Sequence, residues 1–232
     1  MNSTLKLVVC SVILAAVPAV ASALTITDTA DVQFTSDLQP NAPIVLDSFD
    51  STLGTLANVQ IELWHSGSVA IKADNDDQYN SADVQARMIR IWNLTGPDLI
   101  AGAAKTITSP SVFLGLEDLV TPDGVIVDDA APDGHNFGTL SYTDVATGTY
   151  APTNIALYET AGPGSVNLIV DPTQMVNDLQ WVTTAPDAWQ MEVQNPLLTV
   201  TAKVTYTYTP EPATIAVMGL GSLLLRRRRR TA

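Results

Sequence analysis

The sequence predicts an all-β fold, a single β-sandwich with Greek-key-like connections. Short segments of alternating apolar and polar residues recur along the chain, and turn sequences rich in Gly, Pro and Asp separate them. Helical periodicity is scarce, and no repeat of fixed period occurs. Residues 24–209 number 186, which is enough for one sizeable domain.

The first strand pattern lies at residues 59–63, where Val59, Ile61 and Leu63 alternate with polar residues. Residues 64–68 are typical of a turn and the alternation resumes at 69–71, so a hairpin is expected. Further strands are expected at residues 84–92, 137–145, 155–158 and 166–170, with turns at 96–98, 122–124, 132–134 and 162–164.

The last part of this region contains one expected helical turn and the clearest strand. Residues 172–179 are predicted as a short helical turn, with Asp171 as N-cap and Pro172 at the first helical position. Residues 198–208 alternate without interruption between an apolar face and a face of Thr and Lys, which predicts a strand with one face in the core.

The N-terminus is typical of a secretory signal peptide comprising residues 1–23. Lys6 precedes an apolar segment at 7–20, and Ala21, Ser22 and Ala23 form an A-x-A cleavage site. We therefore expect export through the Sec machinery and Leu24 as the first mature residue. An uncleaved N-terminal anchor is the alternative.

Charge and cysteine content limit the chemistry of the body. The only cysteine, Cys10, lies in the apolar segment, so the exported body has no disulfide, thiol nucleophile or cysteine metal site. The net charge is −13, and six of the 11 basic and one of the 24 acidic residues lie outside 24–209, which leaves the body at −18. Such a charge disfavours nucleic acid and anionic lipid as partners.

The C-terminal segment, residues 210–232, differs from the body. Pro210, Glu211 and Pro212 precede 13 residues at 213–225, which Arg226, Arg227, Arg228, Arg229 and Arg230 follow. A helix of this length spans about 20 Å against a bilayer core of roughly 30 Å, so it is short for a permanent anchor. The arginines stop transfer and hold the end on the cytoplasmic side. An ordinary tail anchor and an uncut stop-transfer end are the alternatives.

Together, these three parts resemble the PEP-CTERM sorting signal. That signal is recognised by an exosortase, a membrane-embedded cysteine transpeptidase of Gram-negative bacteria that make exopolysaccharide. The resemblance implies a transient stay in the inner membrane and cleavage near Pro212. It also implies delivery to the cell surface or extracellular matrix.

The body carries a second resemblance. Residues 46–56 and 59–63, and later residues 157–158, 162–168 and 204–208, are similar to the choice-of-anchor E domain. Members of that family are all-β extracellular domains carried on alternative C-terminal anchors. The resemblance implies a fold and a location, and no activity.

No catalytic or metal-binding residue is predicted. Residues 74–79 resemble the start of a calcium loop, but Tyr79 and Gln85 stand where an EF-hand needs Gly and Glu. A solvated acidic hairpin tip is expected, with weak Ca²⁺ binding left open, and no cofactor is predicted. The two histidines, His65 and His135, are expected in surface turns. A second acidic stretch, read in the same way, contains Asp123, Asp128, Asp129 and Asp133.

Three classes of function fit these observations. The leading prediction is a non-enzymatic surface or matrix protein, structural or adhesive within an exopolysaccharide layer. The second is a carbohydrate-binding module, which requires exposed aromatic residues on one sheet face. The third is a secreted hydrolase, which requires converging carboxylates. Trp181 and Trp189 flank a loop, and we expect both to cap the core rather than bind sugar.

Overall fold

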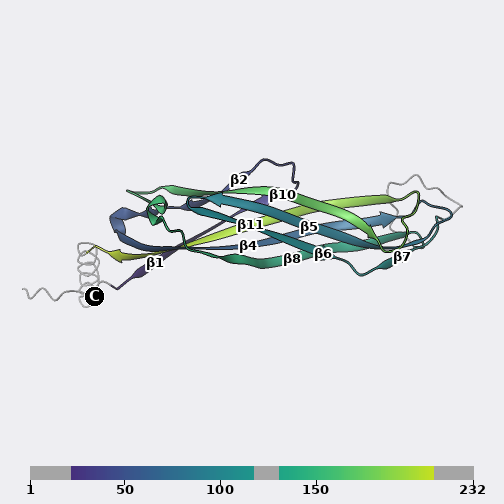
Figure 1. Ribbon diagram of the computed structural model, residues 1–232, viewed down its shortest axis with the longest axis horizontal. Coiled ribbons are helices and arrows are strands. Elements are labelled where there is room, and N and C mark those ends of the chain that lie inside the picture. Colours follow the sequence, from purple (N-terminus) through teal and green to yellow (C-terminus); the bar gives the residue numbers. More distant parts are fainter. Residues whose placement is uncertain (1–21, 118–130, 212–232) are drawn as a thin grey trace, which may run out of the picture.

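The computed structural model describes residues 22–117 and 131–211. The signal-peptide segment before Ser22 and the C-terminal residues from Pro212 onward, including the expected hydrophobic helix, lie outside the described residues. The described part is an elongated antiparallel β-sandwich, so that part of the fold prediction is confirmed (Figure 1). Its main strands are β1 (Leu24–Phe34), β2 (Ala42–Asp47), β4 (Gly54–Asp74), β5 (Ala82–Gly96), β6 (Leu99–Thr108), β8 (Gly134–Tyr150), β10 (Ser165–Trp181) and β11 (Gln190–Pro210).

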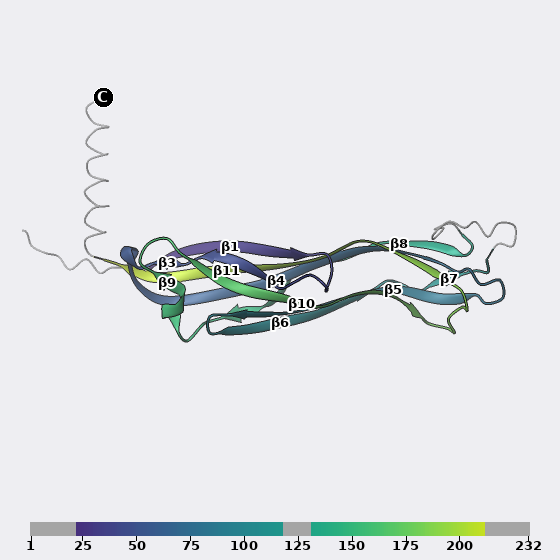
Figure 2. The same cartoon turned by 90° about the horizontal axis from the view of Figure 1, so that it is seen from above.

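Two sheets form the layers of the sandwich, as Figure 2 shows from above. The first has the strand order β1-β11-β4-β8, and the second has the order β2-β10-β5-β6. The short strand β7 (Val112–Leu114) pairs with β5, and β3 (Phe49–Asp50) pairs with β9 (Glu159–Thr160). β5 and β6 form a hairpin, whereas β1 to β2, β2 to β4, β4 to β5, β8 to β10 and β10 to β11 are connections between the sheets.

The length of the strands explains the shape. β4 and β11 each have 21 residues and pair along almost their whole length, with register shifts at Gln194/Leu197 and Thr207/Tyr208. At about 3.3 Å per residue, each strand spans roughly 70 Å. The inward residues of β11 are buried from Leu198 to Tyr206, which confirms the predicted core-facing strand.

The core consists of two apolar clusters along the long axis. The larger cluster contains Phe34, Leu63, Trp92 and Val204, and the smaller one contains Val69 and Met88 among others. On β4, His65 lies between Leu63 of the larger cluster and Val69 of the smaller one. On β5, Arg90 lies between Trp92 of the larger cluster and Met88 of the smaller one. Both polar side chains are fully buried. A buried polar layer therefore separates the clusters.

Arg90 links the two sheets within this layer. Its Nε donates a hydrogen bond to Leu197 O at 3.1 Å, and its Nη2 donates to Ser68 O at 3.0 Å, both on the opposite sheet. Its Nη1 donates to Ile89 O, to Val176 O and to Asn177 Oδ1. Burial lowers the pKa of Arg90 to about 10, so its charge remains at neutral pH. These five bonds compensate for the burial of that charge.

The predicted hairpin around Trp64–Ser68 is wrong, because β4 continues through it as one strand. Ladder pairs with β11 are unbroken here, for example Thr201↔Trp64 and Leu198↔Gly67. Gly67 is not in a turn: a Cβ at this position would lie 2.8 Å from Tyr142 Cε1. The glycine therefore makes room for the tyrosine ring.

Two other local predictions are wrong. Residues 172–179, with Asp171 as N-cap, are not a helical turn but part of β10, where a register shift between Asp171 and Gln174 accommodates Pro172. The segment Ile155–Tyr158 is a 3₁₀ helix rather than a strand. Its Tyr158 is fully buried and donates a hydrogen bond to Pro97 O at 2.5 Å. The other expected strands that the structure describes lie within β5, β8 and β10.

Candidate functional site

The outer face of the first sheet is rich in hydroxyl groups. On β11, threonines alternate with the inward core residues, and several of them stand opposite threonines of β1, for example Thr25↔Thr207 and Thr27↔Thr205. Within the described residues, none of the side-chain hydroxyls of this threonine face makes a hydrogen bond, so all are available to solvent or a ligand. The threonine face consists of Thr25, Thr27, Thr29, Thr199, Thr201, Thr205 and Thr207.

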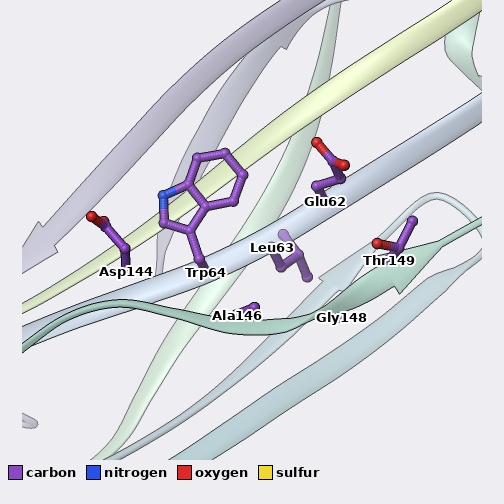
Figure 3. Close-up of a pocket in the computed structure, with 7 residues that line it drawn as sticks. All are labelled: Glu62, Leu63, Trp64, Asp144, Ala146, Gly148 and Thr149. Atoms are coloured by element: carbon purple, nitrogen blue, oxygen red, sulfur yellow. The ribbon is translucent and has the colours of Figure 1, made fainter.

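A hollow adjoins this face, and we call it the Trp64 hollow. It has a volume of about 580 Å³ and lies between β4 and the sheet edge formed by β8. Figure 3 shows the Trp64 indole rising from β4 between the side chains of Asp144 and Glu62. Its lining comprises Glu62, Leu63, Trp64, Asp144, Ala146, Gly148 and Thr149.

Small residues and an irregular ladder create the hollow. Ala146 is the β8 partner of Trp64, and Gly148 is the partner of Leu63, so β8 presents little side-chain volume beside the indole. The β4–β8 register shifts at Leu63/Trp64 and again at His65/Gly67. Such bulges redirect side chains and are frequent next to functional sites.

Asp144 lies at the second irregularity. Its φ is 49°, in the left-handed region, and its backbone N–H donates to Ser66 Oγ at 3.1 Å. Asp tolerates this conformation better than most residues. In the described structure, the Asp144 carboxylate accepts no hydrogen bond from the protein, which leaves its oxygens available in the hollow.

Glu62 is placed differently. Lys203 Nζ lies 2.7 Å from its Oε2, across the β4–β11 ladder, and both side chains are more than a third exposed. The ion pair fixes the orientation of the Glu62 carboxylate but leaves further acceptor capacity. With two carboxylates and one ammonium, the Trp64 hollow carries a net negative charge. The Trp64 indole N–H adds a hydrogen-bond donor to this set.

The expected solvated tip at residues 74–79 is instead an ordered loop with buried polar groups. Asp74, Asn75 and Asp77 are all buried. Asp77 accepts hydrogen bonds from the Asn80 side chain, from the backbone N–H groups of Tyr79 and Asn80, and from Asp187 N. These hydrogen bonds lower the pKa of Asp77 to about 2, and the bond from the Asn80 side chain contributes most. Its oxygens thus connect two loops and are not free to bind a cation.

The second acidic stretch is described only at Asp133. Asp123, Asp128 and Asp129 lie outside the described residues. Across the described ranges, no group of three or more His, Cys, Asp or Glu side chains is arranged to hold a metal ion.

The predicted surface position of His65 is wrong. The ring is 1% exposed, and its Nδ1 lies 2.9 Å from Tyr142 Oη. Burial lowers its pKa, and the positive charge of Lys105 adds to the shift. His65 lies inward because β4 does not turn, so the alternation of the strand directs it to the core. His135 is on β8 and not in a turn; its ring packs edge-on against Phe137 at 4.8 Å.

The two tryptophans near residue 185 behave differently from each other. Trp181 packs against the smaller core cluster, as predicted, whereas Trp189 is 41% exposed. Their rings are 5.5 Å apart in an edge-on arrangement. Trp181 pairs with Val84, which also pairs with Val112 of β7. Both rings therefore lie at the end of the sandwich that includes β7, opposite the end at which β11 finishes (Figure 1).

The predicted processing residues are described only in part. Ala23 is exposed next to the start of β1, and Ala21 is outside the described residues. Pro210 is the last residue of β11, buried and paired with Gly54, and Glu211 is exposed. Pro212 and the arginines 226–230 are outside the described residues. None of the helices in the described ranges has both the length and the apolar character needed to cross a bilayer.

Sequence reasoning missed Trp64, Asp144 and Arg90. Because a turn was expected at 64–68, Trp64 was not assigned to a strand. Its position between Leu63 and His65, which share the opposite face, nevertheless fits a strand. No sequence signal places Asp144 next to Trp64, since the pairing depends on two register shifts.

Comparisons with known proteins add little. No family model matches the chain, and no curated protein matches it. Solved structures of infectious bursal disease virus, of the Gx and Gt strains, are 15% and 16% identical to it, with TM-scores of 0.17 and 0.14. The matches cover 90% of this chain but 49% and 48% of the viral chains, so the chain spans about half their length. Likeness at this level supports no inference about fold or function.

Proposed function

We propose that the chain is an exported surface or extracellular-matrix protein of a Gram-negative-type bacterium, sorted and cleaved by an exosortase. Its role is structural or adhesive rather than enzymatic. The observation that carries the proposal is the C-terminal segment, in which a Pro-Glu-Pro sequence, a short apolar run and five arginines follow one another. This is the resemblance to the PEP-CTERM signal described above.

The geometry of the body supports this role. β11 ends at Pro210, so the sorting segment continues from one end of the elongated sandwich. A chain held in the membrane by that segment places its other end up to roughly 70 Å away. Large exposed side chains occur at this far end, including Tyr79 at 86% and Phe113 at 63% exposure. An elongated body with exposed aromatic residues far from its anchor suits adhesion.

The strand order supports a finer description of the fold. Numbered along the chain, the eight main strands are arranged 1-8-3-6 in one sheet and 2-7-4-5 in the other. We infer a jelly roll, the eight-stranded sandwich of two Greek keys. Jelly rolls host many unrelated functions, so the fold by itself assigns none.

The environments of the carboxylates favour a non-enzymatic role. A glycosidase needs an acid with a raised pKa. Three carboxyl groups, Asp50, Asp77 and Asp98, instead have pKa values lowered by hydrogen bonds, with the largest contributions from Thr52, Asn80 and Thr153 respectively. These hydrogen bonds tie the three carboxylates to donors of nearby turns and loops, which suits a structural role.

Cell fractionation in a host with an active exosortase tests the proposal. Replacing Arg226–Arg230 with Ser removes the cytoplasmic stop, so we expect the protein to leave the membrane with its tail intact. The Glu211→Ala, Pro212→Ala double variant is expected to stay in the inner membrane uncut. It spares Pro210, which is buried in β11, so a sorting defect is separated from a folding defect.

The two variants therefore fail in opposite ways, and mass analysis of the C-terminus tells them apart. The sorting proposal is wrong if the wild-type chain remains in the inner membrane of such a host with Ala232 intact.

A further inference from the structure

We propose that the Trp64 hollow binds uncharged pyranose sugars of a polysaccharide chain. The inference deepens the proposed function and rests on it only for the source of the ligand, the polysaccharide around an exported surface protein. The site itself is argued from the geometry of β4 and β8. Nothing in the sequence alone pointed to Trp64.

The first argument is the aromatic surface. Trp64 is an outward residue on a sheet whose other outward side chains near it are small or polar, as its ladder partners Thr201 and Ala146 show. The indole is half-buried there and belongs to neither core cluster, so part of its apolar area remains open to solvent. The C–H face of a pyranose ring is apolar and packs well on an aromatic face. The volume of about 580 Å³ lies in the range of small-ligand sites.

The second argument is the set of polar groups around the indole. Asp144 and Glu62 accept hydrogen bonds, and Thr149 and Thr201 both donate and accept. Sugar hydroxyls donate to carboxylates in strong charge-assisted bonds. An apolar ligand would leave these acceptors unpaired, whereas a ring bearing hydroxyls on its edge pairs with them and stacks with its face.

The third argument is charge. The hollow is net negative, and the whole body between residues 24 and 209 carries a formal charge of −18. Uronic acids, phosphates and sulfates are therefore repelled. Of the sugars that could stack on Trp64, those without an anionic group therefore fit, and the neutral hexoses are the simplest of these. The adjoining threonine face continues the row of hydroxyl groups across β11 and β1, so a chain of several rings finds further polar partners.

Calorimetric titration of the full chain tests the inference, in a polyoxyethylene detergent that contains no sugar. The probes are the hexasaccharides of β-1,4-glucose, β-1,4-mannose and α-1,4-glucose, with hexagalacturonate as the acidic probe. At least one neutral probe should bind more tightly than the acidic one. Trp64→Ala should weaken binding by about tenfold or more, which corresponds to ~1.4 kcal/mol, and Asp144→Asn should weaken it less.

Two variants serve as controls. Trp189→Ala removes an exposed tryptophan at the far end of the sandwich and should leave binding unchanged. Trp64→Phe keeps an aromatic face and should retain most of the affinity, which separates stacking from misfolding. The test is made on purified protein, so its failure leaves the sorting experiment in cells unaffected.

Three results would overturn the inference. The first is no binding of any neutral hexasaccharide at millimolar concentration. The second is equal binding by the wild-type and Trp64→Ala proteins. The third is sedimentation behaviour of a dimer that Trp64→Ala abolishes, because the hollow would then be a contact between two copies of the chain.

Discussion

Replacing Arg90 with Met tests whether the buried polar layer holds the two sheets together. The change keeps an unbranched side chain and removes all five hydrogen bonds of the guanidinium. At ~1.5 kcal/mol for each bond to a charged group, these sum to roughly 7 kcal/mol. Burial of the Met side chain recovers about 2 kcal/mol. Eliminating the buried charge recovers about 2 kcal/mol more, which leaves a net loss of about 3 kcal/mol.

For a body of 186 residues, a loss of this size lowers the melting temperature by about 6–12 °C. Urea unfolding followed by tryptophan fluorescence measures the free energy directly, and a thermal scan measures the shift. Arg87→Met is the matched control: Arg87 is on the outer face of the same strand, paired with Asp178, and its loss should change the melting temperature little.

Arg90→Lys discriminates between charge and geometry. Lysine keeps the charge but has three donors at one point, so it cannot reproduce bonds to two sheets. We expect it to lose at least as much stability as Arg90→Met. Two results would refute the reasoning that the guanidinium joins the sheets. One is an Arg90→Lys protein as stable as the wild type, and the other is an Arg90→Met protein with the same melting temperature as Arg87→Met.

Four further outcomes are expected. Val204→Asp places an unpaired charge at a fully buried position and should cost more than about 4 kcal/mol in urea unfolding; an unchanged midpoint would show that the side chain faces outward. Gly67→Ala should cost about 1–3 kcal/mol by the same measurement, because its Cβ would crowd Tyr142. The lowered pKa of His65 means that the unfolded chain binds the proton first, so stability falls as pH drops below about 6.5 towards the folded pKa; His65→Gln should flatten this slope. N-terminal sequencing of exported protein should begin at Leu24, and an intact N-terminus would contradict the predicted cleavage.

The sequence predicted the fold class because strand periodicity survives wherever one face is buried. Residues 198–208 show this best, since every second side chain lies in the core. β4 shows the same alternation, but the turn-like composition of residues 64–68 led to the prediction of a hairpin there. A glycine there compensates for a tyrosine on another strand, which composition does not reveal.

The candidate site could not be predicted for a related reason. It depends on which residues of β8 stand opposite Trp64, and two register shifts decide this. The predictions for residues 155–158 and 172–179 were wrong because tertiary contacts, and not local propensity, determine these segments. Tyr158 is held by its contact with Pro97, and a bulge before Gln174 keeps residues 172–179 in β10.

The position of β11 in its sheet has a mechanical consequence. The strand lies between β1 and β4, pairs with both over Leu198–Tyr208, and leads directly into the C-terminal segment. A pull on that segment therefore runs parallel to the strand and loads two hydrogen-bonded ladders in shear at once. A hairpin pulled from its open end would instead unzip bond by bond. Forced extension is governed by the rate of unfolding, and this loading geometry makes that rate slow for a chain held by its C-terminal end.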